Sequence, residues 1–235
     1  MEVKRLEFVS VDGKKVPSFF VDSKSNTALV LIHGYASSKN EMLGLGYELA
    51  EKGYDSYVID LRGHGENENH FDEDVIYDVE GTIDELRKRY DKIVTVGHSL
   101  GGLLSLKSSS NFAVAISPPL MPNVIDVAKF MLRVNSCRVR EADKEVLFKI
   151  LKSYNPPERD RNAMIFYGSG ESKGIELGIK NWAKGRDVKV VVIDEKQAKL
   201  PEIEVDAEKL KEYIPNFVSH LSIIHAEKLL DELSV

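Results

Sequence analysis

Residues 93–102 read IVTVGHSLGG, and the rest of the fold can be inferred outward from them. The apolar run Ile93 to Val96 passes directly into Gly97-His98-Ser99-Leu100-Gly101-Gly102, where a helical pattern begins at Leu100. The chain contains no other G-x-S-x-G pattern. A strand, a sharp turn and a helix in this order predict a serine raised out of a sheet beside a helix N-terminus. Glycine is needed at 97 and 101 because side chains there would collide with neighbouring backbone.

Short apolar runs on both sides of this stretch predict further strands. They are Ala28 to Ile32, Ser56 to Ile59, Phe112 to Ile116, Ala163 to Tyr167 and Val188 to Ile193. Such runs, without strict alternation, suit strands that are covered on both faces. Helical patterns lie between them, and two β-prone runs, Val3 to Val9 and Val16 to Val21, flank Asp12-Gly13. The sequence therefore predicts an α/β fold, with a doubly wound, mostly parallel sheet and an N-terminal antiparallel hairpin.

We expect one domain, residues 1–235, because the chain shows no repeat and no linker. Residues 117–160 carry no strand signal and contain two apolar-faced helical patterns. We interpret them as a helical cap over the site, although two further packing helices of the core are the alternative. Four apolar side chains of this segment are expected to line an acyl pocket: Met131, Leu132, Leu147 and Leu151.

The amino-acid composition limits the partners, cofactors and cellular location that we expect for this protein. The 32 basic and 38 acidic residues are intermixed and give a net charge of -6, which argues against nucleic acid as a partner. Cys137 is the only cysteine, which excludes a disulfide framework and favours a reducing compartment. We expect no metal or other cofactor, since the histidines lack ligand spacing beyond His64 with His70 in an acidic segment. A charged start and no bilayer-length apolar run predict a cytoplasmic protein without stable membrane insertion.

The base that activates a serine is expected after it in the chain, in the order serine, acid, histidine. Only His220 and His225 follow Ser99. Five residues apart on a helix, they would point about 140° away from each other, so both cannot serve the same hydroxyl. We favour His220, which precedes the amphipathic stretch 224–233, and His225 remains the alternative.

A carboxylate must orient that histidine, and two N–H donors must hold the developing oxyanion. Glu171 directly follows a predicted strand, so it would emerge at the carboxyl edge of the sheet, with Asp194 and Glu195 as rivals. The expected oxyanion donors are the backbone N–H groups of Leu100 and Tyr35.

Four motifs together resemble the α/β-hydrolase superfamily. They are His33-Gly34-Tyr35, Asp60-Leu61-Arg62-Gly63-His64-Gly65, Gly97 to Gly102, and Gly168 to Glu171, in the order that the superfamily shows. Within it the chain looks like the branch of monoacylglycerol lipases, lysophospholipases and small carboxylesterases. This resemblance implies Ser99 as nucleophile, Tyr35 and Leu100 as oxyanion donors, Glu171 as acid, a late histidine as base, and a structural role for residues 60–65.

The chain departs from that superfamily at three places. Glu171 stands where the superfamily usually has aspartate, and residues 197–217 separate the last predicted strand from the histidines. Glu66 and Asn67 replace a common serine, and the sequence assigns them no role. Related epoxide hydrolases and dehalogenases carry aspartate at the position of Ser99, so the serine favours acyl transfer.

These observations predict a serine hydrolase that cleaves small-molecule carboxylic esters, with short or medium acyl groups or monoacyl lipids, through an acyl-enzyme. A thioesterase, amidase or aminopeptidase of the same fold is the alternative among enzymes. A catalytically silent ligand-binding protein is the alternative outside them. The oligomeric state stays open.

Overall fold

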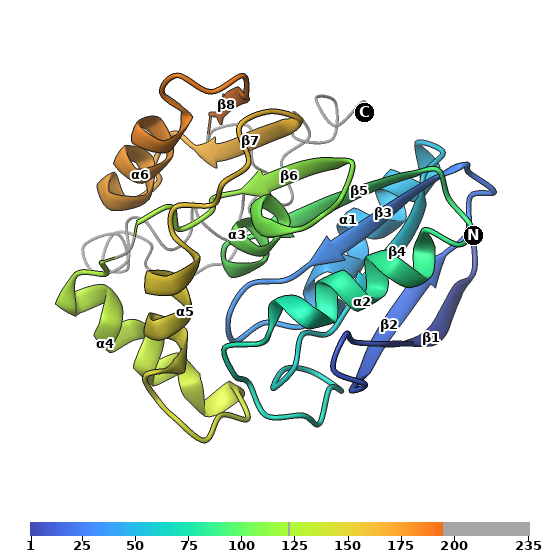
Figure 1. The fold of residues 1–235 in the computed structure, drawn as a ribbon, viewed down its shortest axis with the longest axis horizontal. Coiled ribbons are helices and arrows are strands. Elements are labelled where there is room, and N and C mark those ends of the chain that lie inside the picture. Colours follow the sequence, from blue (N-terminus) through green and yellow to red (C-terminus); the bar gives the residue numbers. More distant parts are fainter. Residues whose placement is uncertain (122, 195–235) are drawn as a thin grey trace, which may run out of the picture.

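The computed structural model describes residues 1–121 and 123–194, which build one eight-stranded sheet with helices on both faces (Figure 1). The strands are β1 (Val3–Val9), β2 (Lys15–Val21), β3 (Thr27–Ile32), β4 (Asp55–Ile59), β5 (Lys92–His98), β6 (Phe112–Ile116), β7 (Ala163–Gly168) and β8 (Lys189–Ile193). The helices are α1 (Lys39–Glu51), α2 (Ile76–Leu86), α3 (Leu100–Lys107), α4 (Asp126–Asn135), α5 (Val146–Tyr154) and α6 (Lys173–Ala183), with a 3₁₀ turn, η1 (Ser136–Arg138), after α4.

The strand order is β1-β2-β4-β3-β5-β6-β7-β8. β2 pairs antiparallel with β1 and β4, and the remaining neighbours are parallel, as the sequence predicts. The chain leaves β3 for β4 on one side and later adds β5 on the other. Because a ligand site in such sheets lies where the strand order reverses, the loops after β3 and β5 mark the candidate position. Ile32 pairs with Gly97, so these two loops start side by side.

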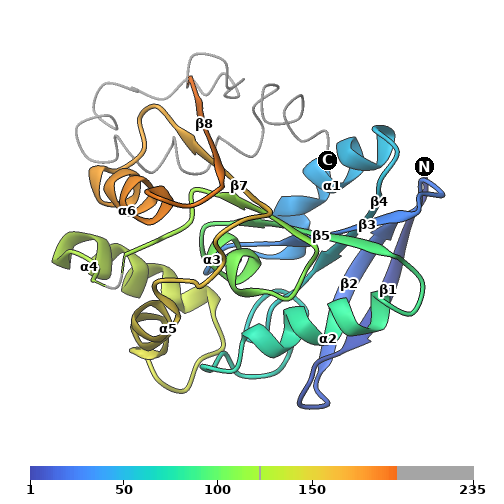
Figure 2. The ribbon, with the colours of Figure 1, turned by 45° about the horizontal axis from the view of Figure 1, so that its top comes forward.

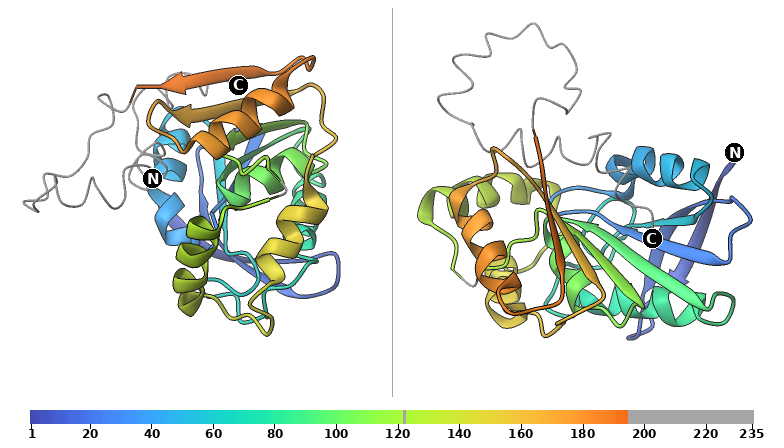
Figure 3. Two further views of the ribbon diagram at one scale, coloured as in Figure 1. Left: turned by 90° about the vertical axis from the view of Figure 1, so that its left-hand side faces the viewer. Right: turned by 90° about the horizontal axis from the view of Figure 1, so that it is seen from above.

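Two apolar layers cover the sheet. On one face α1 buries Met42, Leu45 and Leu49 against strand residues that include Leu31 and Val58. The other face carries the larger cluster, which α2, α3, α5 and α6 help to build. Figure 2 shows α1 on one side of the sheet and α2 and α5 on the other, and Figure 3 shows the twist of the strands. Neighbouring residues of each central strand thus enter opposite layers, which explains why these strands read as continuous apolar runs.

All eight predicted strands are present, but α6 is a helix that the sequence analysis did not predict. Its sequence KGIELGIKNWA contains two glycines, and its buried residues are Ile179 and Trp182. The hydroxyl oxygen of Ser172 accepts a hydrogen bond from the N–H of Ile175 and so caps the helix. Trp182 is 4% exposed, and its indole N–H donates to the carbonyl of Pro157 at 2.9 Å.

The segment between β6 and β7 contains α4, η1 and α5, which agrees with the two predicted helices. Backbone bonds tie it to the loop after β4, because the N–H of Phe71 donates to Arg140 at 2.8 Å and the N–H of Arg140 donates to Gly63 at 2.9 Å. Among the residues that the structure describes, no helix has the length and apolarity needed to cross a lipid bilayer.

Arg62 is a fully buried cation in the loop after β4. Its guanidinium donates to the buried carboxylate of Asp78 at 2.8 and 3.1 Å and also contacts Asp12 and Asp72. Removing one member of a buried pair leaves an uncompensated charge, whereas breaking an exposed pair has little effect.

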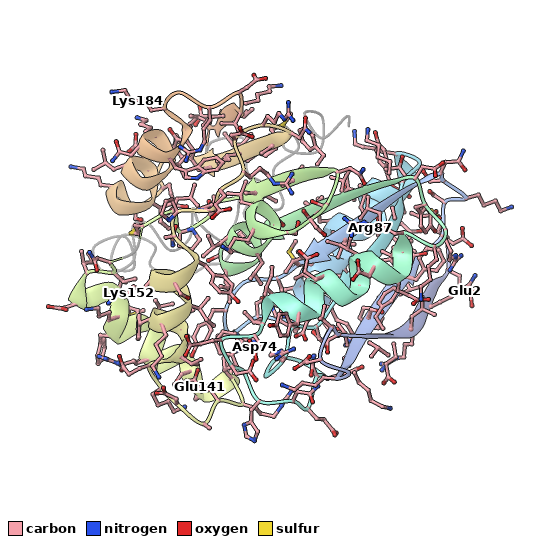
Figure 4. All side chains as sticks on the ribbon, in the orientation of Figure 1. Glu2, Asp74, Arg87, Glu141, Lys152 and Lys184 are labelled. Atoms are coloured by element: carbon pink, nitrogen blue, oxygen red, sulfur yellow. The ribbon has the colours of Figure 1, made fainter. Side chains whose placement is uncertain are left out.

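We therefore predict that Arg62→Met lowers the free energy of unfolding by about 3 to 5 kcal/mol, because Asp78 loses its counter-charge. The matched change Arg87→Met removes an exposed pair with Asp84 and exposed hydrogen bonds to Ser109, and it should cost about 1 kcal/mol (Figure 4). Urea unfolding of the two variants checks this, and equal losses would contradict the role given to burial.

Candidate functional site

Ser99 stands between β5 and α3 in a strained backbone conformation. Its φ of 53° and ψ of -117° lie in a region that costs a side-chain-bearing residue about 1 to 3 kcal/mol. Ser99 is half-buried, while its neighbours His98 and Leu100 are buried. The N–H of Ser99 donates to the carbonyl of Ile116 at 2.8 Å, which fastens the turn to the end of β6. The strain is thus held in place by the adjoining strand.

Two glycines permit this turn because the helix packs directly on strand backbone. A Cβ added to Gly97 would lie 2.0 Å from the carbonyl oxygen of Gly101. A Cβ added to Gly101 would lie 2.1 Å from the carbonyl oxygen of Ile32. Real atoms cannot approach so closely, so the prediction that side chains would collide here is confirmed.

The loop after β3 places its backbone against Ser99. A Cβ added to Gly34 would meet the Cβ of Ser99 at 3.2 Å, so the peptide that joins Gly34 to Tyr35 lies beside the serine. Leu100 is the first residue of α3, and its N–H therefore has no acceptor within the helix. The structure thus brings together the predicted residues Ser99, Tyr35 and Leu100.

His33 fixes the orientation of that peptide. The N–H of Leu61 donates to Nε2 of His33 at 3.1 Å, so the ring proton is on Nδ1, which donates to the carbonyl of Gly34 at 2.7 Å. In a trans peptide the N–H points opposite to the carbonyl, so the bond to His33 also sets the direction of the Tyr35 N–H. His33 consequently acts on the loop rather than on a substrate.

Glu171 lies where the sequence analysis expects the acid, directly after β7 at the carboxyl edge of the sheet. It is 6% exposed, and its Oε1 accepts the N–H of Ser172 at 2.8 Å. Its rival Asp194 follows β8 and is exposed. His220, His225 and Glu195 lie outside the described residues. Burial beside the helix N-terminus favours Glu171 over Asp194 as an orienting carboxylate.

The apolar residues predicted for an acyl pocket occupy different environments. Leu147 and Leu151 are each 3% exposed and belong to the core cluster, Leu132 is half-buried against it, and Met131 is 38% exposed. Contact between these four residues and an acyl group stays a prediction.

A buried carboxylate explains Glu66 and Asn67, to which the sequence analysis gave no role. Asp60 accepts the N–H of Lys39 at 2.7 Å and its Nζ at 2.5 Å, and it also accepts the N–H of Glu66 at 2.8 Å. The carboxylate of Glu66 lies 3.1 Å from the same Nζ, and the side chain of Asn67 donates to the carbonyl of Asp60. Residues 60–67 therefore fold around Asp60, next to His33.

Glu141 is a residue near this site that sequence reasoning missed. Its side chain is fully buried, and its Oε2 accepts the phenol O–H of Tyr35 at 2.9 Å. Tyr35 and Glu141 are 106 positions apart in the sequence. The chain has 38 acidic residues, and no local pattern distinguishes Glu141 among them.

The described part of the chain also contains a hollow that lies away from Ser99. A hollow of about 930 Å³ lies between the β1–β2 hairpin and residues 66–69, and none of the predicted site residues lines it. Charged groups around it already pair, with Arg5 2.8 Å from Glu66 and Lys15 3.0 Å from Glu7. Within residues 1–121 and 123–194, no three His, Cys, Asp or Glu side chains gather as metal ligands.

Two buried histidines beneath the loops are held neutral. Burial is the main cause that lowers the pKa of His64 from 6.5 to about 3, and repulsion from the neighbouring His33 is the second cause. Burial likewise lowers the pKa of His33. The unfolded chain therefore binds more protons than the folded chain below pH 6.5, so stability is complete above that pH and is lost as the pH falls.

We predict that the free energy of unfolding falls between pH 6.5 and 4.5, with a limiting slope of about 1.4 kcal/mol per pH unit for each of His33 and His64. His64→Gln should reduce this slope, and His70→Gln at an exposed position is the control for loss of an imidazole. Urea midpoints at several pH values measure it. A slope that His64→Gln leaves unchanged would show that His64 is not held neutral.

The chain has the α/β-hydrolase fold. Residues 27–126 match the family model described as alpha/beta hydrolase fold, and solved structures of this fold cover most of the chain. Esterase Pf2001 of Pyrococcus furiosus is 20% identical, with a TM-score of 0.65 over 92% of this chain and 89% of that one. An esterase of Pyrobaculum calidifontis is 16% identical, with a TM-score of 0.63 over 96% and 86%. Est1E of Butyrivibrio proteoclasticus, solved with ferulic acid bound, is 14% identical, with a TM-score of 0.61 over 90% and 97%.

Proposed function

We propose that this protein is a serine hydrolase that cleaves small carboxylic esters through an acyl-enzyme, with Ser99 as the nucleophile. The observation that carries the proposal is the strained, half-exposed Ser99 at the β5–α3 turn with the backbone of Gly34 against it. Strain of this kind is retained where it positions a reacting group. Two of the similar structures are esterases, which supports the same reaction class for this chain.

In the proposed first step, the Oγ of Ser99 attacks the ester carbonyl carbon while His220 accepts the hydroxyl proton. The carbonyl oxygen becomes an oxyanion, which the N–H groups of Leu100 and Tyr35 stabilise. The dipole of α3 adds to this stabilisation, because its N-terminus begins at Leu100. Donors that are oriented before the reaction need no reorganisation during it, which is why the His33 bond to Gly34 is useful.

In the second half of the proposed reaction, the imidazolium of His220 protonates the leaving alcohol, and water then attacks the acyl-enzyme with the same histidine as base. Glu171 is the proposed orienting carboxylate. His220 rests on the sequence argument, with His225 as the alternative base.

We further propose that residues 117–160 cap the site and bind the acyl group. Leu147 and Leu151 anchor α5 in the core, whereas Met131 and Leu132 on α4 are accessible to differing degrees. The substrates that fit such a surface are short or medium acyl esters or monoacyl lipids.

A fluorophosphonate probe tests the nucleophile. We predict one adduct by intact mass on the wild type and none on Ser99→Ala, because the probe reacts with an activated serine. Ser117→Ala is the matched control, since Ser117 follows the neighbouring strand β6 with a similar φ of 46° but is fully buried. An adduct that survives Ser99→Ala, or disappears with Ser117→Ala, would contradict the assignment.

Steady-state kinetics with p-nitrophenyl acetate and octanoate test the base. We predict that His220→Ala lowers kcat by about 10⁴-fold or more, whereas His225→Ala changes it little. The reverse result would move the role to His225.

A panel of leaving groups separates the remaining candidates. Esters should be cleaved faster than the matched thioester and anilide, and a faster anilide reaction would favour an amidase or aminopeptidase. Absence of both labelling and turnover in the folded protein would favour a ligand-binding role.

A further inference from the structure

The loop that carries the second proposed oxyanion donor is fastened by its side chain to the segment between α4 and α5. Tyr35 is half-buried, and its ring packs against those of His64 and Phe71, with centroids 5.7 and 5.6 Å away. Its hydroxyl donates to Oε2 of Glu141 at 2.9 Å. Burial and this bond raise the pKa of Tyr35, so the phenol stays a donor at neutral pH. A phenol donating to a carboxylate makes a charge-assisted bond, which is stronger than one between neutral groups.

Two further contacts position Glu141. Lys144 places its Nζ 3.3 Å from Oε1 of Glu141, as an ion pair without a hydrogen bond to that oxygen, and 3.2 Å from the hydroxyl of Ser136 in η1. The backbone of Glu141 forms a parallel bridge with Phe71, next to the Arg140 bonds to the loop after β4. Figure 4 labels Glu141 at the end of α4 and α5 where these two helices connect. Glu141 therefore joins its own segment to two distant loops, through its carboxylate to Tyr35 and through its backbone to Phe71.

We propose that Glu141 is a positioning residue for the oxyanion hole, which holds the backbone of Tyr35 in register with Ser99 through the Tyr35 hydroxyl. This inference rests on the proposed function. If Glu141 has this role, oxyanion stabilisation depends on the position of residues 136–145 relative to the loop after β3. Neither the fold nor the sequence motifs imply this dependence.

The geometry explains why the side-chain bond matters to a main-chain donor. The Gly34 carbonyl is held by His33 and also accepts the N–H of Ser37 at 3.3 Å, so one side of the Gly34–Tyr35 peptide is fixed. The Tyr35 hydroxyl fixes the other side at the far end of a rigid ring. Donors must lie within a few tenths of an ångström of the developing oxyanion, so a loosened tether reduces turnover without removing the donor.

The test compares Tyr35→Phe, Glu141→Ala, Glu141→Gln and the double variant Tyr35→Phe/Glu141→Ala on p-nitrophenyl acetate, whose short acyl group makes few contacts. We expect kcat to fall about tenfold in Tyr35→Phe and Glu141→Ala with KM little changed, less than the loss of a whole donor. Glu141→Gln keeps an oxygen acceptor and should retain most of kcat. The double variant should be no worse than either single variant, because both remove the same bond.

Arg140→Met tests whether the segment acts through Tyr35. The Arg140 side chain donates to the carbonyls of Gly65 and Asn67, both at 2.7 Å, so its loss loosens the same segment without touching Tyr35. Any fall in kcat caused by Arg140→Met should therefore be smaller in the Tyr35→Phe background than in the wild type. Unchanged kcat in Tyr35→Phe, or additive losses in the double variant, would overturn the proposal.

Amide hydrogen exchange supplies a readout that does not require turnover. A peptide spanning residues 33–42 should exchange faster in Glu141→Ala than in the wild type or Glu141→Gln, while a peptide from β2 should not change. Equal exchange in all variants would also overturn the proposal. A wild type that neither reacts with the fluorophosphonate nor hydrolyses esters would instead refute the proposed function, and the exchange result would still decide whether Glu141 tethers the loop.

Discussion

Backbone packed directly on backbone at the start of α3 is the constraint on which the rest of the site depends. Gly97 and Gly101 leave no room for a Cβ, with the nearest carbonyl oxygens only 2.0 and 2.1 Å from where one would lie. This close approach places the N-terminus of α3 against the ends of β3 and β5, at the turn where Ser99 has a φ of 53°. The absence of a side chain at Gly34 lets the loop after β3 lie close to Ser99, since a Cβ there would be only 3.2 Å from the Cβ of Ser99.

The fold can be predicted from local patterns because the residue types within each run are enough to identify a strand. Six apolar runs and two β-prone runs mark the eight strands, and in the central strands the missing alternation reflects two covered faces. The same kind of local information predicted Ser99, Leu100 and Tyr35, since each stands within a few residues of a strand end. The placement of Glu171 after β7 is of this kind as well.

The rest depended on distant contacts that no local pattern encodes. α6 was missed because two glycines and only a small buried face obscure its helical period. Glu66 could not be interpreted from sequence because its partners, Lys39 and Arg5, lie on other elements. Glu141 meets Tyr35 across 106 positions, and in a chain with 38 acidic residues nothing local distinguishes it.

The indole of Trp182 has a practical consequence, because it is the only tryptophan of the chain. It is a buried residue of α6, it donates a hydrogen bond to the carbonyl of Pro157, and the N-terminal end of α6 lies two residues after Glu171. Its fluorescence emission therefore reports on the docking of this one helix, free of signal from any second indole. A red-shifted emission spectrum under mild denaturant would indicate that α6 has separated from the sheet, and with it the support of the candidate acid.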